Sequence, residues 1–279
     1  MMLFDFTVGT SDIRKALTAV AAHAASRPEN ARWWRVRIHL DNDGILIAAS
    51  DMFSAGMAAV PVWATGDTVI DEGSFDIAPL DVQKILAVFK VGKEKPKDEG
   101  GSPQFLLRVQ VHAEQFPAES KDDPDVTVPM ITLTDVSGLI PGETLEVTLL
   151  PPDDTYPDFP SMFARWRARE LSALDTVAVA GDLLGRLKTS ASAYGSSLIL
   201  SSHSGSIVAY CGEKFIGAVS PMRLVADYRT SFDETSTAWD ERLPRSTGFD
   251  LRTATGLHFI DPTDKPEPDE DETDKDTDQ

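Results

Sequence analysis

Two short proline-containing segments carry the residue types best suited to binding chemistry. The first is Asp154-Thr-Tyr-Pro-Asp-Phe-Pro160, and a basic, aromatic stretch over 163–169 follows it. The second is Ala218-Val-Ser-Pro-Met-Arg-Leu224. Aromatic, methionine and proline side chains beside one arginine can form an adaptable apolar groove for a short peptide. The alternative is that Phe159, Met222 and Leu224 belong to an ordinary hydrophobic core.

The sequence offers no constellation of residues for catalysis. Its five histidines show neither a His-Glu-x-x-His spacing nor a cysteine at metal-binding distance, and glycine-rich phosphate-binding motifs and Gly-x-Ser-x-Gly are absent. Asp51, Asp71 and Asp76 flank predicted strands, where turn and capping roles explain them. The run over 122–125 is typical of a solvated acidic loop. We therefore expect a non-enzymatic protein with no cofactor and no bound metal.

Repeated units of one strand, one helix and further strands must position these segments. In the first unit, a helix begins at a Thr10/Ser11 cap and runs to about Ser26, and in the second, Pro79 begins the helix. In the third, Asp182 starts a helix over 183–193. The predicted strands are 3–8, 34–40, 44–50, 54–62, 74–78, 104–112, 126–133, 143–150, 176–180, 197–202, 206–211 and 214–220.

This order predicts an α+β fold with the helices on one face of antiparallel sheets. Residues 1–163 hold two units and form one predicted domain. Residues 164–260 form a second, with one clear unit and an irregular segment over 225–260. Residues 261–279 contain ten acids and two bases and form a predicted disordered tail. Such repeated units can assemble into a ring with the sheets outside and the helices inside.

The net charge and the cysteine count indicate which partners and which cellular compartment suit the protein. The net charge is −19, and the acidic tail contributes much of it. Many of the bases cluster at predicted helices, although on charge alone ordinary solvated helix faces explain such clusters better. The single cysteine, Cys211, fits a reducing cytosol, so we expect a cytoplasmic protein. No stretch resembles a signal peptide or a membrane span.

Several segments resemble the bacterial sliding clamps, the β subunits of replicative DNA polymerases. The stretch Leu46-Ile-Ala-Ala-Ser-Asp-Met-Phe-Ser-Ala-Gly56 is similar to the clamp turn Ala-Thr-Asp-Gly-His-Arg, with Met52, Phe53 and Ser54 in place of Gly-His-Arg. The loop over 156–160 resembles the domain-closing Phe/Tyr-Pro-x-x-Pro. The stretch 219–224 resembles the Met-Pro-Met-Arg-Leu that ends clamp chains, although here 55 residues follow it. The resemblance implies a DNA-clamp fold in a shortened, divergent chain of a phage or accessory type.

The resemblance also implies a pocket for partner peptides. In clamps the corresponding segments form this pocket. Carried over to this chain, the pocket residues are Ser50, Asp51, Met52, Phe53, Tyr156, Pro157, Phe159, Pro160, Pro221, Met222, Arg223 and Leu224.

A clamp fold further implies weak, sequence-independent contact with double-stranded DNA through cations on the helices. The candidate DNA-binding residues are Arg14, Lys15, Lys84, Lys90, Arg186 and Lys188. The expected function is that of a homo-oligomeric sliding clamp, a processivity factor in DNA replication that tethers a DNA polymerase or repair enzyme. A ring would need three or four chains. The alternative is a clamp-fold decoy or adaptor that binds clamp-interacting peptides without encircling DNA.

Overall fold

The computed structural model describes residues 2–41, 44–66, 72–92, 103–116, 126–171, 177–203, 205–222 and 226–242. The chain divides into two compact units, residues 1–223 and 224–279. The second unit is described only over helix α5 (Ala226–Arg242). The acidic tail predicted at 261–279 lies outside the described residues.

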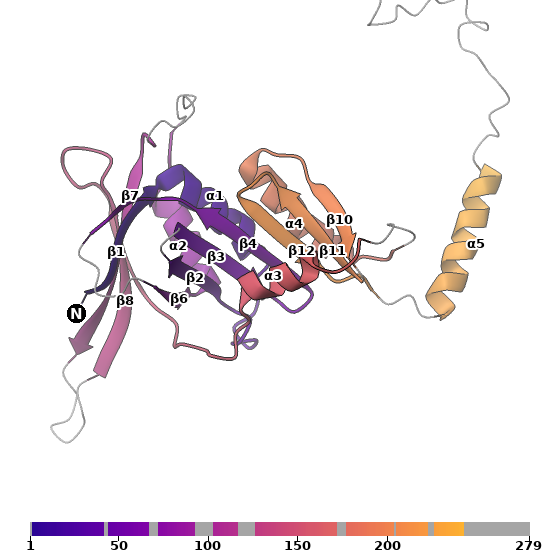
Figure 1. The fold of residues 1–279 in the computed structure, drawn as a ribbon, viewed down its shortest axis with the longest axis horizontal. Coiled ribbons are helices and arrows are strands. Elements are labelled where there is room, and N and C mark those ends of the chain that lie inside the picture. Colours follow the sequence, from indigo (N-terminus) through magenta and orange to yellow (C-terminus); the bar gives the residue numbers. More distant parts are fainter. Residues whose placement is uncertain are drawn as a thin grey trace, which may run out of the picture. The chain divides into compact units, whose positions relative to one another are not determined.

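Two antiparallel sheets form the frame of the first unit (Figure 1). The five-stranded sheet has the order β5-β1-β7-β8-β9 and the seven-stranded sheet the order β10-β11-β12-β4-β3-β2-β6. The strands are β1 (Met2–Gly9), β2 (Val36–Asp41), β3 (Gly44–Ser50), β4 (Ser54–Val60), β5 (Val62–Thr65), β6 (Gly73–Ile77), β7 (Leu106–Phe116), β8 (Val126–Asp135), β9 (Thr144–Thr148), β10 (Ile199–His203), β11 (Ser206–Cys211) and β12 (Phe215–Val219).

The first two sequence repeats exchange their opening strands. Strand β1 of the first repeat pairs with β7 of the second, and β6 of the second pairs with β2 of the first. Both sheets and the two helices of these repeats therefore share one large core, which includes Phe6, Leu17, Ile38, Ile85 and Val109. The predicted α+β class and most of the predicted strands are confirmed.

The third repeat joins the first through its last strand. Strand β12 pairs with β4 from Phe215↔Ala58 to Val219↔Ser54. On the helical side, α1 (Thr10–Ala21) contacts both α2 (Pro79–Val88) and α4 (Gly181–Tyr194). The predicted domain boundary after residue 163 falls inside helix α3 (Phe159–Arg167), and the seven-stranded sheet contains strands from both sides of it. The division into two folding domains stays a prediction.

Helix α3 lies on the opposite face of the seven-stranded sheet from α1 and α4. Its Phe159 and Phe163 pack with Ala48, Val208 and Ala218. The alternate sheet residues Ile47, Ala49 and Ala209 instead join the clusters that contain α1 and α4. Because successive strand residues point to opposite faces, the sheet is covered on both sides.

Three details of the predicted elements are wrong. Helix α1 begins at Thr10 itself after Gly9, without a side-chain cap, and ends at Ala21; Thr10 and Ser11 are buried, and Phe105 O accepts from Thr10 N. The strand predicted at 176–180 contributes only an isolated bridge, Ala178↔Met222, among its described residues. The segment 225–260, expected to be irregular, contains α5, a helix of mostly polar residues that also exposes Phe232 and Trp239.

Candidate functional site

The turn between β3 and β4 is fixed by its own side chains. Ser50 Oγ donates to Ser54 O at 2.7 Å, and Asp51 Oδ1 accepts from the backbone N–H groups of Phe53 and Ser54 at 3.1 and 2.9 Å. Met52 has a positive φ of 82°, a conformation that costs free energy for any residue with a Cβ. The turn holds Met52 and Phe53 outward, where they are 62% and 60% exposed.

An arginine on α4 anchors this turn from the other side of the sheet. Arg186 Nη1 lies 2.5 Å from Asp51 Oδ2 and donates to Ser54 Oγ at 2.7 Å. One helical turn later, Ser190 Oγ donates to Ala19 O at 3.0 Å and lies 3.3 Å from His23 Nε2. Burial, followed by the positive charge of Arg186, lowers the pKa of His23 to about 3. The imidazole is therefore neutral at physiological pH.

A small hollow lies between this turn, helix α3 and the end of β12. It has a volume of about 100 Å³. Its lining includes four of the predicted pocket residues, which are Ser50, Met52, Phe53 and Pro157. It also includes Trp33, Met162, Trp166 and Ser220, which the sequence analysis did not select. The i, i+4 spacing of Met162 and Trp166 after an Asp-x-Pro helix start is the signal that could have found two of them.

The other predicted pocket residues lie elsewhere or are turned away. Tyr156 and Phe159 are buried in the core beneath α3, with exposures of 4% and 2%. The Asp51 carboxylate points to Arg186. Pro160 lines a second, larger groove. Pro221 and Met222 do not border the small hollow; Met222 is half-exposed and its N–H donates to Ala178 O at 2.7 Å. Arg223 and Leu224 lie outside the described residues.

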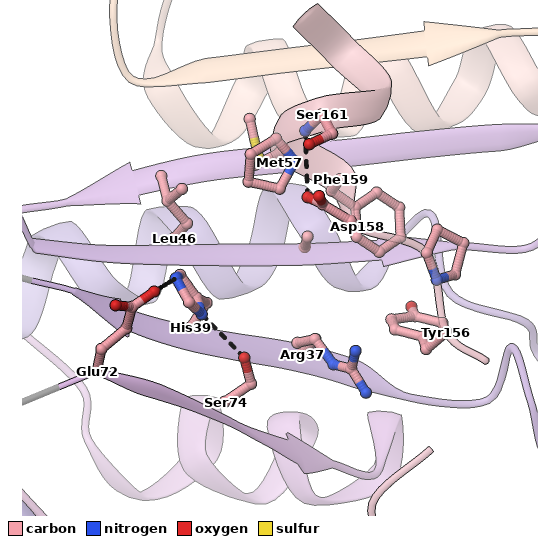
Figure 2. Close-up of a pocket in the computed structure, with 13 residues that line it drawn as sticks. Arg37, His39, Leu46, Met57, Glu72, Ser74, Tyr156, Asp158, Phe159 and Ser161 are labelled. Carbon is pink, nitrogen blue, oxygen red and sulfur yellow. Dashed lines mark hydrogen bonds and ion pairs between the residues drawn. The ribbon is translucent and has the colours of Figure 1, made fainter. Parts of the chain in front are cut away.

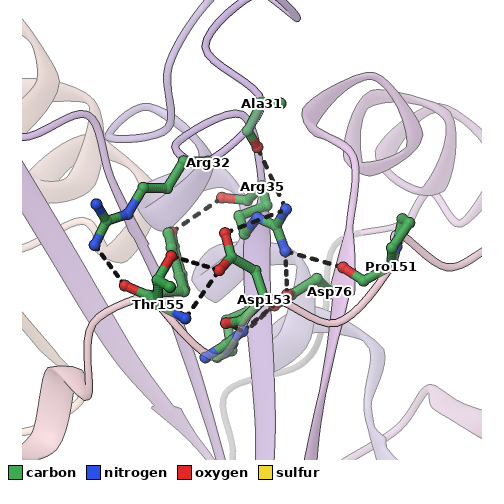
Figure 3. A network of polar contacts seen from close by, with 9 residues as sticks. Ala31, Arg32, Arg35, Asp76, Pro151, Asp153 and Thr155 are labelled. Atoms are coloured by element: carbon green, nitrogen blue, oxygen red, sulfur yellow. Dashed lines mark hydrogen bonds and ion pairs between the residues drawn. The ribbon is translucent and has the colours of Figure 1, made fainter.

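The segment 151–156 reaches the hollow because arginines of the first repeat hold it. Arg35 and Arg37 both bind the buried Asp76, at 2.7 Å for Arg35 and 2.9 Å for each of two bonds from Arg37 (Figure 3). They also donate to Pro151 O at 3.1 Å and Asp153 O at 3.0 Å. The Arg37 guanidinium lies 4.8 Å from the centre of the Tyr156 ring. The loop is thereby fixed against β2 and β6.

The larger groove lies on the other side of Pro157, above β2, β3 and β4 (Figure 2). Its volume is about 460 Å³. Residues 156–161 form one wall, so that Pro157 borders both hollows.

The candidate DNA-binding residues divide into two groups. Lys15, Lys84, Lys90 and Lys188 are exposed. Lys84 is paired with Asp81 at 2.7 Å on the surface of α2. Arg14 donates to Leu86 O and Phe89 O, which are carbonyls at the end of α2, and Arg186 anchors the β3–β4 turn. The two arginines thus have intrachain roles that charge alone did not indicate.

Three further features of the described residues concern metal ions, membranes and the single cysteine. No group of three or more His, Cys, Asp or Glu side chains within it is arranged to hold a metal ion. None of its helices is long and apolar enough to cross a membrane. Cys211 is buried, and burial raises the pKa of its thiol.

Comparison with solved structures identifies the fold. No family model and no curated protein matches the sequence. The structure is similar to the β subunit of DNA polymerase III from Thermotoga maritima, with a TM-score of 0.51 and 12% identity over 81% of this chain and 67% of that one. It is also similar to the β subunit from Borrelia burgdorferi, with a TM-score of 0.50 and 11% identity over 80% and 65% of the two chains. At this identity the likeness shows the fold alone: the chain has the α+β DNA-clamp fold.

Proposed function

We propose that this clamp-fold chain is a non-enzymatic tether that holds a DNA polymerase or repair enzyme on double-stranded DNA. The observation that carries the proposal is the small hollow built from the 50–54 turn, α3 and the end of β12. The hollow adjoins the α3 face of the seven-stranded sheet, whereas Lys15 and Lys188 lie on α1 and α4, which pack on the opposite face. A partner and DNA could therefore bind at the same time.

The hollow suits an apolar peptide side chain. Met52 and Phe53 are exposed at its edge, and Trp33, Met162 and Trp166 are partly buried around it. Methionine adapts its shape to a ligand, and large aromatic side chains supply much apolar surface at low entropic cost. Exposed apolar groups that gather at one hollow favour a binding site over scattered surface exposure.

The proposed contact with DNA is weak because few exposed lysines make it. Exposed lysines on α1, α2 and α4 can reach phosphates without reading bases. Few such contacts, in a chain of net charge −19, favour low affinity that moderate salt abolishes. Weak contact is what a protein that slides along DNA requires.

The test removes the exposed side chains of the turn. The probe is a labelled peptide with a Leu-Phe pair as its anchor, chosen because it offers the apolar lining one aliphatic and one aromatic side chain. The double variant Met52→Ala, Phe53→Ala should weaken its binding by at least about tenfold, as measured by fluorescence anisotropy, because two buried contacts are lost. The matched control is Phe116→Ala, which removes an exposed phenylalanine from β7 in the other sheet. Equal affinities for the turn variant, the control and the unaltered protein would refute the pocket.

A second function is favoured by the positions of the two arginines. Because Arg14 and Arg186 serve α2 and the 50–54 turn, fewer cations are available for DNA than the helices contain. A clamp-fold adaptor or decoy that binds the same peptides without encircling DNA accounts for this. It would bind the Leu-Phe peptide, remain monomeric and show no retention on DNA at low salt.

A further inference from the structure

The larger groove has an apolar floor open to solvent. Leu46 and Met57, on neighbouring strands β3 and β4, are partly buried there (Figure 2), and Phe159 and Pro160 also line the groove. The volume of about 460 Å³ accommodates more than one side chain. Since Pro157 borders both hollows, a peptide anchored in the small hollow has a short path into this groove.

The charged side chains at the groove that could still bind a ligand are acidic. Arg37 is the cation in its lining, but both carboxylate oxygens of the buried Asp76 already accept from it. The Glu72 side chain is 69% exposed, and among the residues that the structure describes its carboxylate pairs with His39 alone, at 3.9 Å. His39 Nδ1 in turn lies 2.9 Å from Ser74 Oγ.

Asp158 supplies the second carboxylate. It caps α3 by accepting from Ser161 N at 3.1 Å. Hydrogen bonding to the Ser161 side chain, followed by this backbone bond, lowers the pKa of Asp158, with smaller contributions from Arg165 and His39. The group is therefore ionised at neutral pH. Figure 2 shows Glu72 and Asp158 on opposite sides of the apolar floor. A basic side chain lying across Leu46 and Met57 would have a carboxylate at either side.

We propose that the larger groove is a second subsite of the partner site and that it takes a lysine or arginine flanking the apolar anchor of the same peptide. This inference rests on the proposed function of the small hollow. The expected partners are protein segments in which basic residues precede or follow an aromatic or aliphatic anchor. The long stem of lysine or arginine covers the apolar floor, while its charged end reaches Glu72 or Asp158.

The test compares peptides that differ only in the flank. Labelled peptides share a Leu-Phe anchor and carry Lys-Lys, Gln-Gln or Glu-Glu on either its N-terminal or its C-terminal side. In one orientation the Lys-Lys peptide should bind about three- to tenfold tighter than the Gln-Gln peptide, and the Glu-Glu peptide weaker still, in low salt. High salt should reduce this preference.

The double variant Glu72→Gln, Asp158→Asn should remove the preference and leave the affinity of the Gln-Gln peptide unchanged. Asparagine retains the capping of α3, so the wall of the groove persists. The control is Glu146→Gln, which removes an exposed acid from β9 and should retain the preference. An equal preference in the double variant would overturn the basic subsite while leaving the small hollow intact. If the Met52→Ala, Phe53→Ala variant binds the Gln-Gln peptide normally, or no peptide binds at all, the proposed function fails instead.

Discussion

The position of Arg186 on a basic helix predicts a DNA contact, but its side chain instead stabilises a turn at the end of the sheet. It lies on α4 among exposed lysines, yet its guanidinium binds Asp51 and Ser54 of the 50–54 turn. The Asp51 side chain is largely buried, so the pair is screened less than a surface ion pair. We infer that Arg186 holds the turn in the conformation that presents Met52 and Phe53.

The variant Arg186→Met should lower the free energy of unfolding by about 1–3 kcal/mol, because it deprives a largely buried carboxylate of its cation. It should also weaken binding of the Leu-Phe peptide while leaving the salt dependence of DNA binding unchanged. Chemical denaturation and anisotropy measure the two effects.

The matched control is Lys188→Met on the same helix, which removes an exposed cation. It should change stability by less than about 0.5 kcal/mol and reduce the slope of log K against log salt for DNA by roughly one. If the two variants weaken DNA binding equally, Arg186 is a DNA contact and the assignment to the turn is wrong.

At the scale of elements, the joint between α1 and α4 depends on a neutral histidine. His23, just beyond α1, is fully buried near Ser190 of α4. Its ring packs against the Phe215 ring, with the two ring centroids 5.9 Å apart. Gly56 of β4 lies directly beneath it, since a Cβ at that position would be 2.6 Å from His23 Cδ2. The joint therefore has no room for a protonated, hydrated imidazole.

Acid should weaken this joint. The pKa of His23 is about 3 in the folded protein and near 6.5 when unfolded, so the unfolded chain binds more protons between these values and stability falls as pH drops through that window. Between pH 7 and pH 5 the contribution is about 2 kcal/mol. In His23→Gln the pH dependence of urea unfolding should be smaller by that amount. An unchanged slope in His23→Gln would contradict the argument.

The sequence predicted the elements whose burial is periodic and missed those fixed by tertiary contacts. Strand β2 follows from its alternating apolar and polar residues, β3 from its apolar run, and α2 from Pro79 and its apolar spacing. Helix α3 escaped prediction because prolines at 157 and 160 resemble a loop, although Asp158 as N-cap and Pro160 in the first turn are helix-start signals. Helix α5 is mostly polar, and Phe232 and Trp239, two turns apart on one face, were not recognised as a helix signal.

The site was predictable only in part for the same reason. The 50–54 turn and Pro157 were found through local resemblance, and the structure brings them to one hollow. Trp33 reaches it through the fold from the chain between α1 and β2, and no local pattern marks it. The buried state of Phe159 depends on α3 packing over Ala48 and Val208, which is a contact between distant parts of the sequence.

At the scale of the whole molecule, the joint between the third and first repeats suggests how one chain could join another. Strand β12 pairs with β4, and the helices α4 and α1 of the same two repeats contact one another. In the second repeat the corresponding strand is β9, which ends the five-stranded sheet. Unpaired backbone groups along such an edge are able to pair with another chain. We propose that β9 of one chain joins a repeat of the next, so that three or four chains close a ring.

Light scattering behind a sizing column at micromolar concentration should then give three or four times the mass of one chain. Leu149 N donates to Pro129 O of β8, so the alternate N–H at Thr148 faces the outer edge of β9, next to the point where Leu150 N donates to Asp76 O of β6. Thr148→Pro removes that donor without breaking the β8 pairing and should shift the assembly toward monomer. Thr148→Val keeps the N–H and should retain the assembly. A monomer for the unaltered protein at every concentration would exclude the self-closing ring and favour the adaptor, whereas an assembly unaffected by Thr148→Pro would place the joint at another edge.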